Sequence, residues 1–168
     1  MSQTWVDPGR VLKATRKASV SVLARFGAYV MRTARAMLRP ARQLALSALN
    51  PRQRARYQRR LERAKRLGLP VPRRPTESSR PGEPPRSQTG LLRRWILFGV
   101  NPDEPSVVIG PALLPGHAGA EALEALEVGG RSTTAQGYEV TVQPRPFMGP
   151  AFQQELPQAA AMWRDSIQ

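Results

Sequence analysis

The densest group of chemically active side chains in this sequence is a run of cations between residues 51 and 67. Eight side chains there are positively charged at neutral pH: Arg52, Arg54, Arg56, Arg59, Arg60, Arg63, Lys65 and Arg66. Glu62 is the single acid among them. A guanidinium donates paired hydrogen bonds to the oxygens of a phosphate or a carboxylate. The run therefore predicts contact with a polyanion or with an acidic protein partner.

The same run of cations also has simpler possible causes. All but three of the 26 cations of the chain are arginine, and a GC-rich genome gives the same bias without a functional cause. An exposed basic helix can also dock on acidic subunits or on membrane headgroups. Because like charges this close repel one another, we expect the segment to gain order where anions neutralise it.

Side chains suited to catalysis are scarce. The chain has no cysteine, so it has no thiolate nucleophile, no thiolate metal site and no disulfide. The single histidine, His117, lies between Pro-Gly and Ala-Gly and is expected in a loop. Glu121, Glu124 and Glu127 recur at every third residue, as on a helix surface rather than in a metal site. The sequence therefore predicts that the protein is not an enzyme and holds no metal or cofactor.

The charge of the chain is divided unevenly between its two parts. Residues 1–94 hold 23 Lys or Arg against four Asp or Glu, whereas residues 95–168 hold three against eight. Such a division indicates different partners: a polyanion or acidic surface for the first part, and mainly protein for the second.

A long first helix must position part of this charge. Asp7-Pro8-Gly9 is a helix start, and Pro40 ends the helix near Leu38 or Arg39. Residues of the expected inner face recur at spacings of three and four: Val11, Ala14 or Thr15, Ala18, Val22, Phe26, Tyr29 or Val30, Thr33 and Met37. This pattern predicts one buried face. The other face carries lysines and arginines, which face either solvent or an anionic partner.

The basic run itself is predicted to be a second helix. Residues 41–49 are only weakly amphipathic. Asn50 followed by Pro51 is a capping residue followed by a favoured first position. Gly68 and Pro70 close the helix after Leu67. Its apolar stripe is narrow: Tyr57, Leu61, Ala64 and Leu67.

A proline-rich stretch follows and suggests how the chain is organised. Prolines at 70, 72, 75, 81, 84 and 85 stand among Ser, Arg and Glu, a composition typical of an extended linker that can reach on the order of 60 Å. We therefore divide the chain into a long helix (1–40), a basic helix with a proline-rich extended arm (41–90) and a compact module (91–168).

The compact module has the patterns of a small α+β fold. Residues 95–100 and 106–109 are predicted to be two strands joined by the turn at 101–105. Residues 120–127 are predicted to be a short helix stopped by Gly129-Gly130, and Gly137 opens a further strand. We expect a small antiparallel sheet, with the long first helix and the last helix on one of its faces.

A connector of Gln143–Pro150 joins the last strand to the last helical segment. Its three prolines fix φ and remove backbone donors, so it should be rigid and should lie outside the middle of any helix or sheet. Phe147 and Met148 can then fill the seam between helix and sheet. The corner that we expect in the core or at an interface comprises Trp95, Phe98, Arg145, Phe147, Met148 and Trp163.

Three strings in a fixed order resemble a known family. Arg145–Ala151, continued by residues 154–157 and 162–167, resembles the C-terminal signature of the tail-completion or neck proteins of long-tailed bacteriophages, often named minor tail or Z-like proteins. Pro81–Leu92 is similar to the family's Pro-rich approach to its first strand, and Ser106–Pro111 to its second strand. Glu127–Gly130 departs by one residue from the family's Glu-Phe-Gly-Gly-like string.

The resemblance covers about half of the chain, from residue 81 to 167, and implies a structural virion protein. It implies a cyclic homo-oligomer, six copies in the family, at the head–tail junction, made in the bacterial host cytoplasm. Its partners would be copies of itself, the adjacent neck, tail-terminator or head-closure proteins, and the viral DNA along the basic arm.

Two other classes of function compete with this interpretation. A nucleic-acid-binding protein of ribosomal type would also combine a basic extension with a small acidic body. Against it, Tyr57 is the only aromatic residue in positions 41–94 available to stack on bases. A membrane-surface protein would need a large aromatic helix face, which the basic helices lack. No apolar run is long enough for a spanning helix. The Arg-rich, acid-poor N-terminus has the composition of a transit peptide, although it lacks the features of a signal peptide.

Overall fold

The computed structural model describes residues 7–112, 120–133 and 137–166, which form an α+β fold. The helices are α1 (Pro8–Met37), α2 (Pro51–Arg66), α3 (Leu91–Arg94), α4 (Ala120–Val128) and α5 (Met148–Arg164), with a 3-10 turn at Leu46–Ala48. The strands are β1 (Ile96–Asn101), β2 (Ser106–Pro111), β3 (Gly130–Thr133) and β4 (Glu139–Val142). The fold class expected from the sequence is confirmed.

Helix α1 begins and ends close to where Asp7-Pro8-Gly9 and Pro40 predict. The Asp7 carboxylate accepts hydrogen bonds from the backbone N–H of Gly9 at 2.9 Å and of Arg10 at 3.4 Å, so it satisfies donors that a helix start leaves free. The helix runs for 30 residues and ends before Leu38. At about 1.5 Å per residue its length is about 45 Å. Both the β1–β2 hairpin and α5 pack on this helix.

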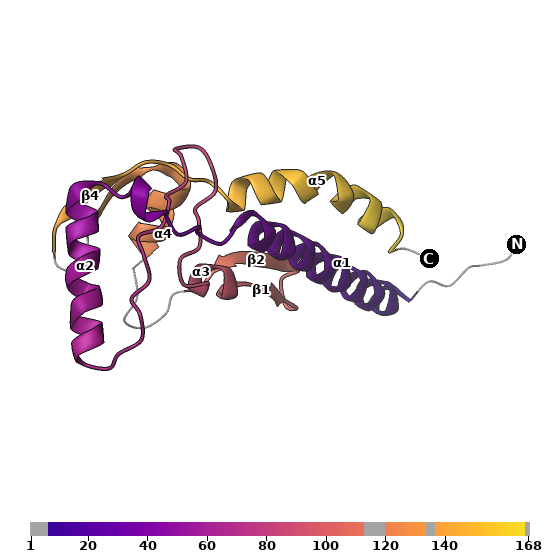
Figure 1. Cartoon of the computed structure of the whole chain (residues 1–168). Coiled ribbons are helices and arrows are strands. Elements are labelled where there is room, and N and C mark those ends of the chain that lie inside the picture. Colours follow the sequence, from indigo (N-terminus) through magenta and orange to yellow (C-terminus); the bar gives the residue numbers. More distant parts are fainter. Residues whose placement is uncertain (1–6, 113–119, 134–136, 167–168) are drawn as a thin grey trace, which may run out of the picture.

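The body has three layers, and α1 is the middle one (Figure 1). The β1–β2 hairpin packs on one side of α1 and α5 packs on the other. The core between them comprises Val22, Phe26, Val30, Ala34, Leu38, Ile96, Phe147, Ala151 and Met162. The expected arrangement has both helices on one face of a sheet. In the structure α5 packs mainly on α1, and its first turns border β2, where Val107, Ile109, Met148 and Phe152 line one hollow with Val30.

The hairpin approaches α1 most closely at Gly27, which is buried. A Cβ atom at this position would lie 2.8 Å from Phe98 Cδ2 and 2.8 Å from Val107 Cγ2. Strands β1 and β2 pair antiparallel, with Phe98 opposite Ile109. At the turn, Arg16 of α1 donates to the carbonyl oxygens of Pro102 and Asp103. The absence of a side chain at Gly27 therefore allows the β1–β2 hairpin to lie this close to α1.

The remaining strands form a separate sheet. Strand β3 pairs antiparallel with β4, with Ser132 opposite Val140, and α4 packs beside β3. The sequence predicted β4 but not β3, because Gly-Arg-Ser-Thr has no alternation of apolar and polar residues. The expectation of a single sheet is thus corrected to two two-stranded sheets.

Helix α5 begins inside the predicted connector and buries only part of the apolar stripe that its spacing predicts. Its first residue is Met148, so the connector ends one turn earlier than its prolines suggested. The buried positions are Ala151, Glu155 and Met162. The spacing of apolar residues after the connector predicts a stripe of Phe152, Leu156, Ala159 or Ala160, Met162, Trp163 and Ile167. Of these, Met162 is buried, whereas Phe152 is 39%, Leu156 44% and Trp163 39% exposed. Ile167 lies outside the described residues.

The proline-rich segment doubles back on its own chain rather than extending away from it. The backbone N–H of Leu44 donates to Pro75 O at 2.9 Å, and that of Glu77 donates to Arg42 O at 3.0 Å. Further along, Ser87 N–H donates to Arg39 O at 2.9 Å. These bonds bring α2 to the end of the molecule opposite the N-terminus of α1 and the C-terminus of α5 (Figure 1).

Candidate functional site

The basic helix α2 is well defined at both ends. The Asn50 side chain accepts from Gln53 N–H at 2.8 Å, and the Gln53 side chain accepts from Asn50 N–H at 3.2 Å, which is a complete capping box. At the other end Gly68 has φ of +63°, and Leu69 N–H donates to Ala64 O at 2.9 Å. This pattern is a Schellman motif. The local sequence alone therefore fixes where α2 begins and ends.

Only a narrow face of α2 is buried. Ala64 is buried, whereas Tyr57 and Leu61 are half-buried. Leu67, expected in the same apolar stripe, is 54% exposed. A helix with so little buried apolar surface presents most of its side chains to solvent or to a partner.

All eight predicted cations of α2 are exposed. Arg54 Nη2 donates to Leu46 O at 3.1 Å. Within the described residues, the ion pairs are Arg16 with Asp103 at 3.5 Å and Arg86 with Glu77 at 4.0 Å, so no cation of α2 is paired with an acid there. The positive charge of α2 is thus left for an external anion.

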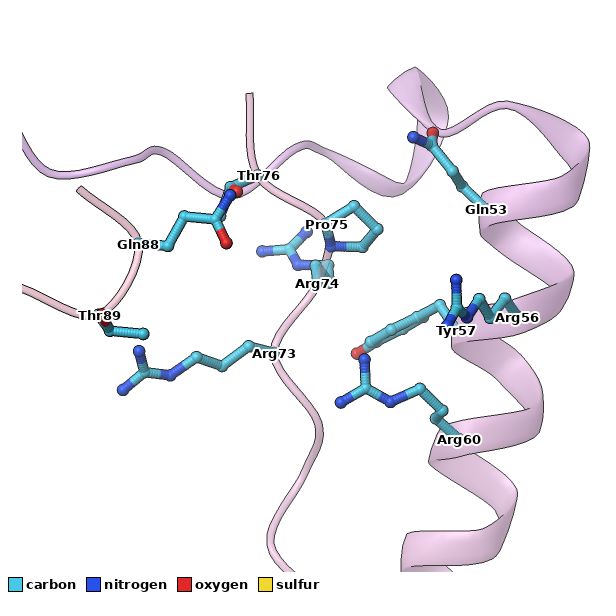
Figure 2. Close-up of a pocket in the computed structure, with 10 residues that line it drawn as sticks. All are labelled: Gln53, Arg56, Tyr57, Arg60, Arg73, Arg74, Pro75, Thr76, Gln88 and Thr89. Atoms are coloured by element: carbon cyan, nitrogen blue, oxygen red, sulfur yellow. The ribbon is translucent and has the colours of Figure 1, made fainter. Parts of the chain in front are cut away.

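A groove of about 560 Å³ lies between α2 and the extended segment that doubles back beside it (Figure 2). Its volume is in the range of ligand sites. Its lining residues are Gln53, Arg56, Tyr57, Arg60, Arg73, Arg74, Pro75, Thr76, Gln88 and Thr89. Four guanidinium groups, two amides and three hydroxyls therefore line the groove, and none of its lining residues is an acid.

The second wall of the groove is held by backbone pairing. Gln43 and Thr76 form an antiparallel bridge, flanked by the Leu44–Pro75 and Glu77–Arg42 bonds. The Arg74 side chain donates to Gln43 Oε1 at 3.4 Å. In Figure 2 the side chains of Tyr57 and Arg60 extend from α2 toward this wall. The groove is therefore built from two positioned walls.

The structure separates the predicted cations into groups. Arg56 and Arg60 line the groove. Arg52, Arg59 and Arg56 line a second hollow on α2 itself, beside Pro51 and Ala55. The other predicted cations, Arg54, Arg63, Lys65 and Arg66, lie outside the groove. The groove cations Arg73 and Arg74 were missed, because their position opposite α2 depends on long-range pairing that no local pattern reveals.

The predicted corner is built around the N-terminus of α5. The Glu127 carboxylate of α4 accepts from the backbone N–H of Phe147 at 3.0 Å, of Met148 at 3.2 Å and of Gly149 at 2.7 Å. A carboxylate here satisfies free donors and is favoured by the helix dipole. Glu127, which the sequence placed in a surface row, is therefore the cap that links α4 to α5.

The other corner residues are distributed unevenly. Phe147 is 1% exposed, and Met148 packs against the same core. Arg145 donates to Ser79 O and Gln143 O, each at 3.3 Å, and so ties the connector to the proline-rich segment. Trp95 and Phe98 are half-buried. Trp163 lies outside the core, because the buried position of that turn of α5 is Met162.

The described residues contain no group of three metal-ligating side chains, and none of their helices has the length and apolarity to cross a membrane. His117 lies outside the described residues. Comparison with protein-family models, with curated proteins and with solved structures finds no match for this chain. The interpretation of the candidate site therefore depends on the chemistry of its residues.

Proposed function

We propose that this chain is a structural virion protein: a ring-forming tail-completion or neck subunit at the head–tail junction of a long-tailed phage. Its basic segment contacts neighbouring rings or the DNA. The proposal joins the family resemblance of residues 81–167 to the way the surface of the molecule is divided.

The observation that carries the proposal is the separation of two kinds of exposed surface. On α5, Phe152, Leu156 and Trp163 form an exposed apolar stripe at helical spacing. Near the N-terminus of α1, Val11 is 49% and Leu12 is 70% exposed. The cations of α2 lie at the opposite end of the molecule (Figure 1).

These two surfaces suit two different contacts. Grouped apolar side chains at a protein surface favour association with protein, and a head-to-tail contact between two different surfaces of identical subunits gives a closed ring when the rotation closes. We assign the α5 stripe to contacts between copies of this chain. The α2 end then faces the DNA or the adjacent neck, tail-terminator or head-closure proteins.

The proposal is tested by the native mass of the purified chain between about 50 mM and 200 mM salt, a range over which phosphate contacts weaken strongly. We expect one discrete oligomer whose mass does not change with salt, because apolar contacts are not screened. Electron microscopy of the same sample should show closed rings. A chain that remains monomeric at every concentration would contradict the proposal.

The alternative is a nucleic-acid-binding protein of ribosomal type. The unpaired cations of α2 and Tyr57 in the groove favour it. A monomer that binds nucleic acid with a steep salt dependence would support this alternative.

A further inference from the structure

The groove between α2 and residues 73–76 has features that the exposed cations of α2 alone lack. Its cations come from two segments: Arg56 and Arg60 from α2, and Arg73 and Arg74 from the facing segment, where the Arg73 side chain extends toward Thr89 rather than toward α2 (Figure 2). Groups on opposite walls can bond to oxygens on two sides of one anion. A single helix face can bond from one side only.

The polar residues between the cations complement an anion rich in acceptor oxygens. Gln53 and Gln88 carry amide donors, and the hydroxyls of Tyr57, Thr76 and Thr89 can donate. Guanidinium groups donate hydrogen bonds and accept none. The groove is therefore rich in hydrogen-bond donors, and none of its lining residues carries a carboxylate.

We propose that this groove binds the phosphodiester backbone of a nucleic-acid strand, with Arg56, Arg60, Arg73 and Arg74 pairing with successive phosphates. The inference rests on the proposed function, because that function brings the basic end of the chain close to DNA. It goes further by assigning the contact to one groove and to Arg73 and Arg74, which lie outside the basic helix.

Charge favours a nucleic acid over an acidic protein surface as the occupant. A nucleic-acid backbone is uniformly anionic and rich in acceptors. A protein surface normally presents cations among its acids, and no acid lines the groove to pair with those cations. The second row of arginines on α2, which includes Arg52 and Arg59, also suits a long polyanion that continues beyond the groove.

The half-buried ring of Tyr57 allows a test of whether the bound phosphodiester backbone belongs to a single strand or to a duplex. A strand with unpaired bases can stack a base on the ring, which contributes about 1–3 kcal/mol per stacked base. A strand within a duplex keeps its bases paired and contacts the groove through phosphates alone. Replacement of Tyr57 by Ala should therefore weaken a single strand about 5-fold or more and a duplex much less, if the single strand is the occupant.

The experiment measures binding of the full chain to a labelled DNA duplex, to a single strand of the same length and to poly-glutamate. The groove variant is Arg60→Gln with Arg73→Gln. The matched control is Arg63→Gln with Arg66→Gln, which removes the same charge from α2 outside both the groove and the second row of arginines. All four residues are exposed, so both variants should fold, and circular dichroism and melting temperature check that they do.

We expect the groove variant to lose affinity at least 10-fold more than the control. The loss of two phosphate contacts should also reduce the slope of log K against log salt by about 1.8 for a duplex or about 1.4 for a single strand. If the duplex or the single strand binds more tightly than poly-glutamate, the groove is supported as a nucleic-acid site. The tighter of the two nucleic acids is then its occupant. Equal losses in the two variants would overturn the inference, as would poly-glutamate binding as tightly as DNA.

The native mass of each variant distinguishes failure of this inference from failure of the proposed function. A salt-resistant ring with equal DNA affinity in both variants would overturn the groove and leave the ring intact. A monomer whose DNA affinity depends on the groove arginines would support the groove and contradict the ring.

Discussion

At the scale of single residues, Glu127 has the most specific structural role. Its carboxylate accepts from three consecutive backbone N–H groups at the start of α5. Replacement of a capping side chain by Ala costs about 0.5–2 kcal/mol, so Glu127→Ala should lower the free energy of unfolding by about that amount. Chemical denaturation provides the measurement.

The matched control for this variant is Glu124→Ala. Glu124 lies on the same helix and is exposed, so its removal should change the free energy of unfolding by only a few tenths of a kcal/mol. Equal losses for the two variants would show that the cap does not stabilise the corner.

Glu155 is a second residue whose environment makes a prediction. It is 5% exposed and accepts a short hydrogen bond from the Thr33 hydroxyl, while its Oε2 has no partner. A buried charged group without a full set of partners costs more than a neutral one. We therefore expect Glu155→Gln to raise the melting temperature, and the exposed Glu139→Gln to leave it unchanged. A lower melting temperature for Glu155→Gln would contradict this account.

The residue types that capping and turn rules recognise were predictable from sequence. Asp7, Asn50 and Gly68 mark helix ends in the structure as in the sequence. Glu127 and Glu155 were not predictable, because their partners lie about 20 and 122 residues away along the chain. A helical glutamate at regular spacing looks the same whether it is a surface charge or a buried acceptor.

At the scale of elements, the packing of the hairpin on α1 depends on Gly27. Ala at this position would gain about 0.5–1 kcal/mol of helix propensity. Its Cβ would, however, lie 2.8 Å from both Phe98 and Val107, and overpacking typically costs about 1–3 kcal/mol. We expect Gly27→Ala to be destabilising overall, as measured by thermal unfolding.

Gly99 of β1 provides the opposite case. No atom lies within 4 Å of a Cβ added there, so Gly99→Ala should be neutral or stabilising. If Gly27→Ala proved as stable as Gly99→Ala, the close approach of hairpin and helix would be wrong.

The basic segment should be removable as a unit. Leu44 and Pro75 are hydrogen-bonded neighbours, so a short Gly-Ser linker can replace residues 45–74 without moving either end. The three-layer body contains none of these residues in its core. We expect the shortened chain to retain cooperative unfolding and to lose DNA affinity, as monitored by circular dichroism and binding titration. An unfolded product would refute the separation of the two parts.

For α5 the sequence predicted a helix but not which of its faces is buried. Spacing correctly placed a helix after the connector, but Phe152, Leu156 and Trp163 share a face that is apolar and also exposed. Periodicity identifies an apolar face without saying whether the same chain or another one covers it. The groove is a similar case, because the segment that carries Arg73 and Arg74 lies beside α2 only after it has folded back.

At the scale of the whole molecule, the two ends of the folded molecule carry different kinds of side chain. The layered body carries the apolar stripe of α5, and the far end carries α2 with its unpaired cations (Figure 1). The uneven charge of the sequence predicted two kinds of partner. The structure adds that the apolar stripe of α5 and the cations of α2 lie at opposite ends of the molecule (Figure 1).

The most direct test of this account is the native mass of the wild-type chain beside two variants of α5. Leu156→Asp places a charge in the middle of the apolar stripe, and Gln154→Asp places the same charge at another exposed position of the helix. The account predicts a discrete ring for the wild type and for Gln154→Asp, and a folded monomer for Leu156→Asp. A ring that survives Leu156→Asp, or a wild-type chain that never assembles, would contradict it.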